Sequence, residues 1–366
     1  MNKIVVSLKE SSYPILIGEN IFAKVPELIN KFKLNKNFLI IIDKNVYAFH
    51  DKSINQSFKN FNYKKNLYIL NTGEKTKSYL ELNKIYSFLL KNNYGRDSLI
   101  ISIGGGVTGD LSGYAAATYM RGIQIIHIPT TLLAAVDSSI GGKTGINFEK
   151  KKNMIGSFYQ PKFVLIDTNF LKTLPKPEIT SGLGEVIKYA FLSDEYFFKY
   201  MKDNLKKLFL LDEKILLKII LVSDKIKAGV VSQDEKESGL RKILNLGHTF
   251  AHAFETELNF SIKHGEAVIA GIICALVLSN RLGLLSSEDL NNYLTLPLMV
   301  KLPKKLHGLD KNNLYNIMLH DKKNKGGKIK FVLLSKIGKI LLDVEVDKKD
   351  LFYTFNEMGK ILFSSK

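Results

Sequence analysis

Three histidines of this 366-residue chain fall within 17 residues of one another. His248 and His252 are four residues apart, so a helix would place both on one face, as in a metal-binding pair, and His264 follows beside a glycine. Glu185 and Lys188 are likewise about one helical turn apart. One glutamate with two histidines is a frequent catalytic zinc set that leaves positions open for substrate oxygens. The spacing does not decide which two histidines bind, and hydrogen-bonded core or surface histidines remain the alternative.

A glycine-rich segment follows an apolar run and precedes a helical pattern. Gly104, Gly106 and Gly109 satisfy the G-x-G-x-x-G spacing, which lets backbone N–H groups approach a pyrophosphate at the start of the next helix. The acidic residue usually found about 20 positions further on is missing. Asp43, at the end of an earlier apolar run, is a candidate to bind the ribose instead. The alternative is a tight strand-to-helix turn that binds nothing.

Between these motifs lies a set of side chains suited to binding phosphate or carboxylate: Arg121, Lys143, Lys152, Asn153, Lys188, Lys227 and Arg241. The segment 141–144 (GGKT) matches the end of a phosphate-binding P-loop. The first glycine of that motif would have to be residue 137, which is Asp137, so the P-loop interpretation fails. For any one lysine, a solvated surface position remains the alternative.

The elements that must position these residues show two patterns. Short β-branched apolar runs, typical of strands buried on both faces of a parallel sheet, occupy 38–43, 67–70, 98–103, 123–128 and 163–166. Residues 79–90 and 109–120 predict helices between them, and this alternation indicates a doubly wound α/β domain. After prolines at 175 and 177 the periodicity is helical, over 205–222, 247–258 and 266–281, and 329–334 with 338–342 predict a hairpin. We expect an amino-terminal Rossmann-like parallel-sheet domain, 1–177, and a mainly α-helical domain, 178–366, with a cleft between them.

Composition restricts the classes of partner. The net charge is +18, but only four of the 53 basic residues are arginine, and the lysines are spread along the chain. This favours generic surface charge over nucleic-acid binding, although a positive field would attract a phosphorylated small substrate. The longest run free of polar side chains, 267–278, is shorter than the roughly 20 residues of a membrane helix. With one cysteine and no apolar signal segment, we expect a cytoplasmic protein that binds neither nucleic acid nor membranes.

Taken together, the ordered motifs resemble the 3-dehydroquinate synthase family of sugar-phosphate cyclases, over nearly the whole chain. They are Gly104–Asp110, Tyr119–Gly122, Ile128–Thr131, Asp137–Thr144, Lys152–Gly156, Gly184–Lys188, Arg241–His252 and His264–Glu266. The resemblance implies a lyase of the shikimate pathway that converts 3-deoxy-D-arabino-heptulosonate 7-phosphate to 3-dehydroquinate and phosphate. The implied steps are transient oxidation by NAD, β-elimination of phosphate, re-reduction, ring opening and aldol closure.

The same resemblance implies cofactors and roles for individual residues. A divalent metal, zinc or cobalt, would be bound by Glu185, His248 and His264. NAD would be bound by Asp43, Glu74, Lys77, Gly106, Val107, Thr108, Gly109, Asp110, Thr130, Thr131, Phe170, Leu171, Lys172 and Thr173. The catalytic set would be His252, Glu237, Lys188 and Lys143, with His252 and Glu237 accepting protons.

The sugar-phosphate substrate would be bound by Asp137, Lys143, Lys152, Asn153, Lys188, Lys227, Arg241, Asn245, His252 and Lys323, or Lys322 in place of Lys323. Arg121 would reach the site from the partner in a homodimer. Another cyclase, such as a 2-deoxy-scyllo-inosose or 2-epi-5-epi-valiolone synthase, and a metal-dependent alcohol dehydrogenase are the alternatives. Asn153, His252 and the segment 321–323 favour the dehydroquinate enzyme.

Overall fold

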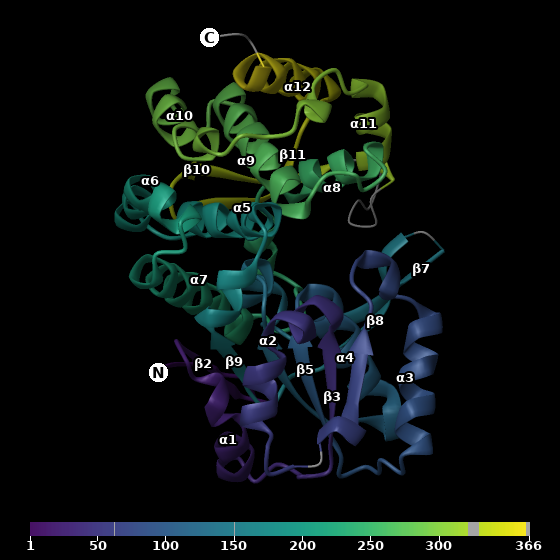
Figure 1. Ribbon diagram of the computed structural model, residues 1–366. Coiled ribbons are helices and arrows are strands. Elements are labelled where there is room, and N and C mark those ends of the chain that lie inside the picture. The colour runs from purple at the N-terminus through teal and green to yellow at the C-terminus, as the bar shows by residue number, and fades with distance from the viewer. Residues whose placement is uncertain (62, 150, 321–328, 364–366) are drawn as a thin grey trace. The chain divides into compact units, whose positions relative to one another are not determined.

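The chain folds into two compact units, shown in Figure 1. The computed structural model describes residues 1–61, 63–149, 151–320 and 329–363. Unit 1 comprises residues 1–175 and 213–236, and unit 2 comprises 176–212 and 237–366.

Unit 1 is built on a seven-stranded sheet with the strand order β1-β2-β9-β6-β5-β3-β4. Strand β1 pairs antiparallel with β2, and the other neighbouring strands pair in parallel. The strands are β1 (Asn2–Val6), β2 (Tyr13–Gly18), β3 (Phe38–Asp43), β4 (Leu67–Leu70), β5 (Leu99–Gly104), β6 (Gln124–Pro129) and β9 (Val164–Asp167). A separate hairpin pairs β7 (Lys143–Phe148) with β8 (Lys151–Phe158).

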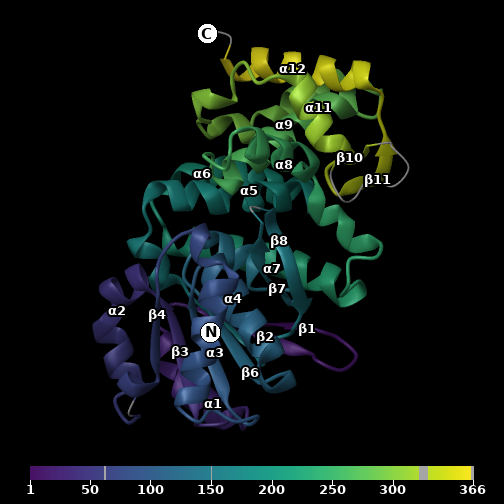
Figure 2. The same cartoon turned by 90° about the vertical axis from the view of Figure 1, so that its right-hand side faces the viewer.

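Helices cover both faces of this sheet, as Figure 1 and the turned view in Figure 2 show. They are α1 (Val25–Lys31), α2 (Lys44–Ser57), α3 (Tyr79–Lys91), α4 (Gly106–Thr118) and α7 (Glu213–Gln233). Alternate residues of β3 enter two different cores: Ile40 packs in the core that includes residues of α1 and α2, and Ile41 packs in the core that includes residues of α3 and α4. A strand with both faces buried needs apolar residues at every position, which accounts for the run 38–43.

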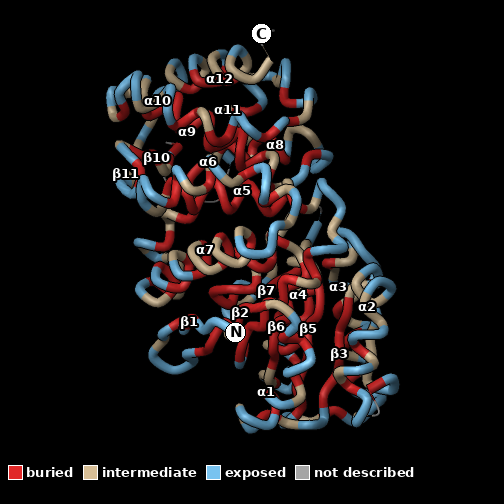
Figure 3. The backbone as a smooth tube through the Cα atoms, turned by 60° about the vertical axis from the view of Figure 1, so that its left-hand side comes forward, coloured by how far each residue is buried: buried red, intermediate tan, exposed pale blue. Residues whose placement is uncertain are grey.

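Unit 2 is mainly helical and is organised around α9 (His264–Arg281), which is buried along most of its length (Figure 3). Its other helices are α5 (Lys176–Leu192), α6 (Glu195–Phe209), α8 (His248–Glu257), α10 (Ser287–Leu294), α11 (Lys311–Leu319) and α12 (Lys348–Phe363). Strands β10 (Lys330–Lys336) and β11 (Lys339–Glu345) form a hairpin. None of the helices in the described parts of the chain has the length and apolar character that a membrane crossing requires.

The structure confirms the predicted fold class and the five predicted strands of the parallel sheet to within one residue, whereas β10 and β11 extend two and three residues beyond the predicted runs 329–334 and 338–342. Two further expectations need correction. The predicted helix 205–222 is wrong: α6 ends at Phe209 and α7 starts at Glu213, and Leu211 between them has a φ of 56°. The prediction assigned α7 to the second domain, 178–366, whereas α7 belongs to unit 1. The β1–β2 and β7–β8 hairpins were not predicted.

Helix α7 carries a buried carboxyl group, that of Asp224. Asp224 is fully buried, and neither of its carboxylate oxygens has a hydrogen-bond partner among the described residues. Burial raises the pKa of Asp224 well above its ordinary value, Lys227 opposes the rise, and Asp137 adds to it. The folded chain therefore holds a proton here that the unfolded chain releases once the pH exceeds about 3.9.

We expect Asp224→Asn to stabilise the protein at pH 7.5, and by a smaller margin at pH 5. The raised pKa makes Asp224 cost more folding free energy as the pH rises toward that pKa, and a neutral amide of similar shape removes this cost. The gain should therefore be the larger of the two at pH 7.5. Urea unfolding at both pH values measures it, with the exposed Glu10→Gln in unit 1 as the control. A gain that does not change with pH would contradict the assignment.

Candidate functional site

Three side chains of unit 2 converge on one point. The Nε2 atoms of His248 and His264 lie 3.4 Å and 3.3 Å from the same oxygen, Oε1 of Glu185. One ligand atom from each residue lies within 4.8 Å of the other two. Glu185 is fully buried, and its Oε1 has no hydrogen-bond partner among the described residues. A buried carboxylate oxygen facing two imidazole nitrogens fits a divalent cation such as zinc.

Helices α5 and α9 bring Glu185 and His264 together because their backbones meet at glycines. A Cβ atom on Gly184 would lie 2.4 Å from the Cα of Gly265, and a Cβ on Gly265 would lie 1.9 Å from the carbonyl oxygen of Ser181. Both distances are too short for any side chain, so only glycine permits this approach. Each glycine is the neighbour in sequence of one of the converging residues.

A second close contact positions His248. Gly247 precedes α8 with a φ of 78°, a conformation that side chains rarely adopt. A Cβ on Gly271 in α9 would lie 2.1 Å from the carbonyl oxygen of Gly247. Two glycines therefore let the first turn of α8 lie directly on α9, where His248 faces Glu185.

The charges around Glu185 favour its ionised form. The ammonium group of Lys188 contacts Oε2 of Glu185, and both side chains are almost completely buried. Burial raises the pKa of Glu185, but Lys188 and His248 together outweigh burial and hold that pKa well below its ordinary value. Burial lowers the pKa of His248 to about 4 against the opposing effect of Glu185, so this imidazole is neutral at pH 7 and its Nε2 can be a ligand.

His264 has a carboxylate on each side of its ring. Its Nδ1 lies 3.5 Å from Oε2 of Glu255, while its Nε2 faces Glu185. Burial lowers the pKa of His264, but Glu185 and Glu255 outweigh burial and raise it to about 10. The sequence reasoning did not single out Glu255. Its position seven residues after His248, on the same face of a helix, is the signal that could have found it.

His252 lies beside this group, with its ring centroid 5.6 Å from that of His248, but it is not among the residues whose ligand atoms converge. The spacing left open which histidines converge with Glu185, and in the structure they are His248 and His264. Elsewhere in unit 2, Oε1 of Glu237 accepts a hydrogen bond of 2.7 Å from Asn245, and Glu237 has a φ of 59°. Arg241 is only 2% exposed.

In unit 1 the glycine-rich segment forms the predicted strand–turn–helix, from β5 into α4. A Cβ on Gly104 would lie 2.5 Å from the side chain of Thr108, and a Cβ on Gly105 would lie 2.9 Å from that of Thr131. The first turn of α4 contains Gly106, Val107, Thr108, Gly109 and Asp110. The first hydrogen bond of the helix runs from the Gly109 N–H to the Gly105 oxygen, so the N–H groups before Gly109 have no partner within the helix. These donors suit a pyrophosphate.

An ion pair between a buried lysine and a partly exposed aspartate lies beside this turn. The Lys77 ammonium contacts the carboxylate of Asp110 and the side-chain oxygen of Asn153. Burial raises the pKa of Asp110, and Lys77 opposes the rise. Lys77 therefore links Asp110, which was expected at the NAD site, to Asn153, which was expected at the substrate site.

Other residues expected to bind NAD already have partners in unit 1. The Asp43 carboxylate caps α2, accepting from the N–H groups of Asn45 and Val46, and Glu74 accepts from Asn147. Thr131 Oγ1 accepts from the Ala134 N–H, Lys172 pairs with Glu19, and Thr173 bonds to His50. Phe170 and Leu171 are buried. Thr130 is also buried, and its hydroxyl has no hydrogen-bond partner in the described chain.

The remaining substrate candidates occupy three places. The Nζ atom of Lys227 lies 2.7 Å from Oδ1 of Asp137 and 2.5 Å from the backbone oxygen of that residue. Lys143 and Lys152 lie on the β7–β8 hairpin, with Lys143 exposed at the first position of β7. Arg121 is exposed and has a φ of 68°. Lys322 and Lys323 lie outside the described residues.

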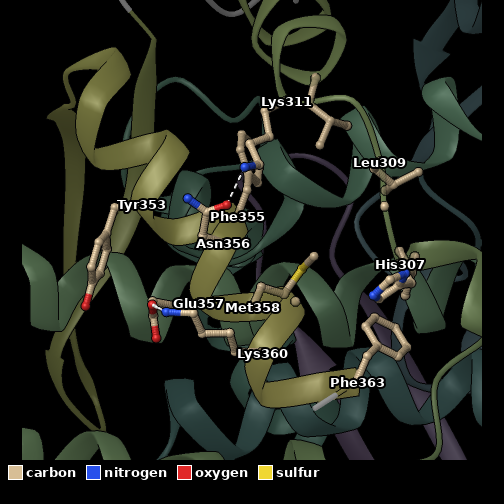
Figure 4. A pocket seen from close by; sticks show the side chains of 14 residues that line it. His307, Leu309, Lys311, Tyr353, Phe355, Asn356, Glu357, Met358, Lys360 and Phe363 are labelled. Atoms are coloured by element: carbon tan, nitrogen blue, oxygen red, sulfur yellow. Dashed lines mark hydrogen bonds and ion pairs between the residues drawn. The ribbon is translucent and has the colours of Figure 1, made fainter.

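Unit 2 also has a cavity of about 590 Å³ near the carboxy-terminal helix, which Figure 4 shows from close by. Lys311, Asn356 and Phe363 are among the residues that line it. It contains none of the residues that converge on Glu185, so it is a separate feature.

Two protein-family models match consecutive parts of the chain. Residues 67–181 match the model of the amino-terminal part of 3-dehydroquinate synthase, and residues 182–324 match that of its carboxy-terminal part. The 3-dehydroquinate synthase of Acetivibrio thermocellus is 41% identical over 96% of this chain and 97% of its own length. The 3-dehydroquinate synthase of Aliivibrio fischeri is 43% identical over 92% of this chain and 94% of its own length.

Solved structures show the same fold. A 2-deoxy-scyllo-inosose synthase, complexed with carbaglucose-6-phosphate, NAD⁺ and Co²⁺, has a TM-score of 0.86 at 26% identity, covering 97% of this chain and 100% of its own. The 2-epi-5-epi-valiolone synthase of Streptomyces hygroscopicus, with NAD⁺ and Zn²⁺ bound, has a TM-score of 0.86 at 24% identity, covering 97% and 98%. Because the curated relatives match at far higher identity and along almost the whole chain, this protein belongs to the 3-dehydroquinate synthase family of enzymes.

Proposed function

We propose that this protein converts 3-deoxy-D-arabino-heptulosonate 7-phosphate to 3-dehydroquinate and inorganic phosphate, using NAD and one divalent metal ion. The observation that carries the proposal is the convergence of Glu185, His248 and His264 in a chain whose curated relatives, at 41–43% identity, are named 3-dehydroquinate synthase. Zinc and cobalt are the proposed metals because the cyclases of the same fold contain Zn²⁺ or Co²⁺.

The proposed metal ligands are Glu185, His248 and His264. The buried Oε1 of Glu185, without a hydrogen-bond partner among the described residues, and the two Nε2 atoms beside it are the donor set that such an ion prefers. When bound there, the ion would polarise substrate hydroxyl groups and ease the loss of their protons. Three protein ligands leave coordination positions for those hydroxyls.

The proposed NAD site lies in unit 1, around the turn into α4. The first-turn N–H groups of residues 106–108 would bind the pyrophosphate. The further candidates are Asp43, Glu74, Lys77, Thr130, Thr131 and residues 170–173. When bound, NAD supplies a reversible oxidation that makes the C–H bond beside the new ketone acidic enough for phosphate to leave by β-elimination.

The proposed task of the polar side chains is to orient the substrate and move protons. The phosphate and carboxylate of the substrate would be bound by Lys143, Lys152, Lys227 and Arg241, because cationic side chains hold such groups through charge-assisted hydrogen bonds, and by the amide of Asn153. Asp137 and Asn245 would bind hydroxyl groups. His252, beside His248, and Glu237 would accept protons. The ammonium group of Lys188 would stabilise negative charge on the substrate near the metal ion.

The test is to incubate the purified protein with NAD, Zn²⁺ or Co²⁺ and the heptulosonate, and to measure inorganic phosphate. Phosphate release without accumulation of NADH supports the proposal. NADH accumulation would indicate an alcohol dehydrogenase. If the protein were another cyclase, it would release phosphate from a different sugar phosphate, such as glucose 6-phosphate, and none from the heptulosonate.

We also propose a homodimer in which Arg121 serves the partner's site, and a cytoplasmic location. Arg121 is exposed, and both Arg121 and Met120 have positive φ angles, which is uncommon for non-glycine residues and is enriched at functional positions. The cytoplasmic proposal is supported by the single buried cysteine, which suits a reducing compartment.

Replacing a metal ligand should abolish turnover. We expect Glu185→Gln and His264→Ala each to reduce phosphate release by more than about a hundredfold, because a bound ion lowers the activation barrier by several kcal/mol. Removing the metal with a chelator from the unchanged protein should have the same effect, reversed by Zn²⁺ or Co²⁺. Circular dichroism checks that both variants are folded. Near-normal activity in both variants would refute the metal assignment.

Lys188→Ala should weaken catalysis more than NAD binding. Lys188 contacts Glu185 in unit 2, whereas the proposed NAD residues lie in unit 1. We expect kcat to fall by at least about tenfold, because an oriented charge at the reacting end of the substrate is lost. The dissociation constant for NAD, measured by calorimetry, should change by less than about twofold. An equal loss of NAD affinity and of kcat would contradict this role.

Mixed dimers test Arg121. A heterodimer of an Arg121→Ala subunit and a His264→Ala subunit should regain about half the activity of the unchanged dimer, because the first subunit keeps its metal ligands and receives Arg121 from the second. Both variants should be nearly inactive as homodimers. Differently tagged subunits, expressed together, allow the heterodimer to be purified. If Arg121 acted within its own subunit, the heterodimer would be inactive.

A further inference from the structure

Both histidines that face Glu185 have their second ring nitrogen beside an oxygen. Nδ1 of His248 lies 3.2 Å from the backbone oxygen of Leu246, and Nδ1 of His264 lies 3.5 Å from Oε2 of Glu255. In both rings Nε2 is the nitrogen closest to Glu185. The two imidazoles therefore have the same orientation relative to the proposed ion but different groups behind them.

The group behind a histidine decides which nitrogen can bind a metal. A ring nitrogen that binds a metal must first lose its hydrogen, so a protonated ring such as that of His264 releases one proton on binding. An oxygen acceptor beside Nδ1 keeps the remaining hydrogen there and leaves the Nε2 lone pair for the metal. For His248 the acceptor is a backbone carbonyl, which the start of α8 fixes. For His264 it is a side chain, and that side chain can be changed.

Glu255 is placed for this task. It lies in α8, seven residues after His248 and so near the same face of the helix, and α8 packs against α9, which begins at His264. The Glu255 residue is only 4% exposed. A buried carboxylate is rare in proteins unless it interacts with a positive or donating group, and His264 is such a group.

Glu255 does not belong to the ligand set itself. It lies on the Nδ1 side of His264, and the group of ligand atoms that converge consists of Glu185, His248 and His264. We propose that Glu255 is a positioning residue, which holds the His264 ring so that its Nε2 lone pair points at the metal ion. This inference rests on the proposed metal site and extends it to a fourth residue.

Metal affinity tests the inference directly. Glu255→Gln keeps the size of the side chain but weakens the acceptor, and we expect the dissociation constants for Co²⁺ and Zn²⁺ to rise about tenfold to a hundredfold, the range found for such supporting partners. Competition with a chromophoric chelator measures both constants. The visible absorption of bound Co²⁺ should also change, because one of its imidazole ligands is held less firmly.

The matched control is Glu257→Gln, the same chemical change in the same helix at a residue that is not one of the groups converging on His264. It should keep the metal affinity within about twofold, which separates positioning from a general loss of negative charge. Circular dichroism of the metal-free proteins checks that both variants are folded. Unchanged metal affinity in Glu255→Gln, or an equal loss in both variants, would overturn the proposal.

The same measurements keep the two proposals apart. An unchanged protein that binds Co²⁺ and loses affinity on Glu255→Gln, but releases no phosphate from the heptulosonate, would refute the proposed reaction and support the positioning role. An active enzyme whose metal affinity does not depend on Glu255 would refute only the positioning role.

Discussion

The candidate metal centre depends on three helices whose backbones touch. Side chains normally keep helix axes 8–10 Å apart, but Gly184 against Gly265, and Gly247 against Gly271, remove the Cβ atoms that would prevent a closer approach. Glu185, His248 and His264 are each next in sequence to one of these glycines. The glycines therefore bring ligands from α5, α8 and α9 close enough for their short side chains to converge, without any long loop. Any side chain at Gly265 would meet the Ser181 carbonyl and separate Glu185 from His264.

This close packing also buries charge, and the charges around Glu185 are arranged to tolerate it. A buried carboxylate is costly unless opposite charges or hydrogen bonds compensate for it. Lys188 neutralises one oxygen of Glu185, and the other faces two imidazole nitrogens and accepts no hydrogen bond from the described residues. Asp224 in unit 1 is the contrasting case, because burial outweighs the opposing effect of Lys227 and raises the pKa of this carboxyl group, which favours its protonated form. Glu185 is thus kept ionised, as a metal ligand must be, by neighbours that leave its Oε1 accessible to an ion.

Much of this arrangement could be predicted from the sequence, where the physical signal is local. The runs 38–43 and 67–70 coincide with β3 and β4, because strands of a parallel sheet flanked by helices are apolar throughout. The break between α6 and α7 gave no signal, since Leu210 and Leu211 continue the apolar pattern although Leu210 is 82% exposed. The β7–β8 hairpin was missed because Gly145 and Gly156 face each other through bare backbone, which leaves no alternating pattern. The spacing of His248 and His252 suggested a pair, whereas tertiary packing selects His264.

The fold by itself does not decide between the reactions of enzymes that share it. A protein of Sinorhizobium meliloti described as a probable glycerol dehydrogenase shares the fold with a TM-score of 0.66 at only 15% identity, and two cyclases of different names share it with a TM-score of 0.86. A framework common to such enzymes cannot by itself select one substrate. Selection must come from the side chains that would contact the substrate, such as Asn153, His252 and Arg241. The curated 3-dehydroquinate synthases match more than nine-tenths of this chain at 41–43% identity, whereas the solved cyclases match it at 24–26%, so the resemblance to the former extends well beyond the shared fold.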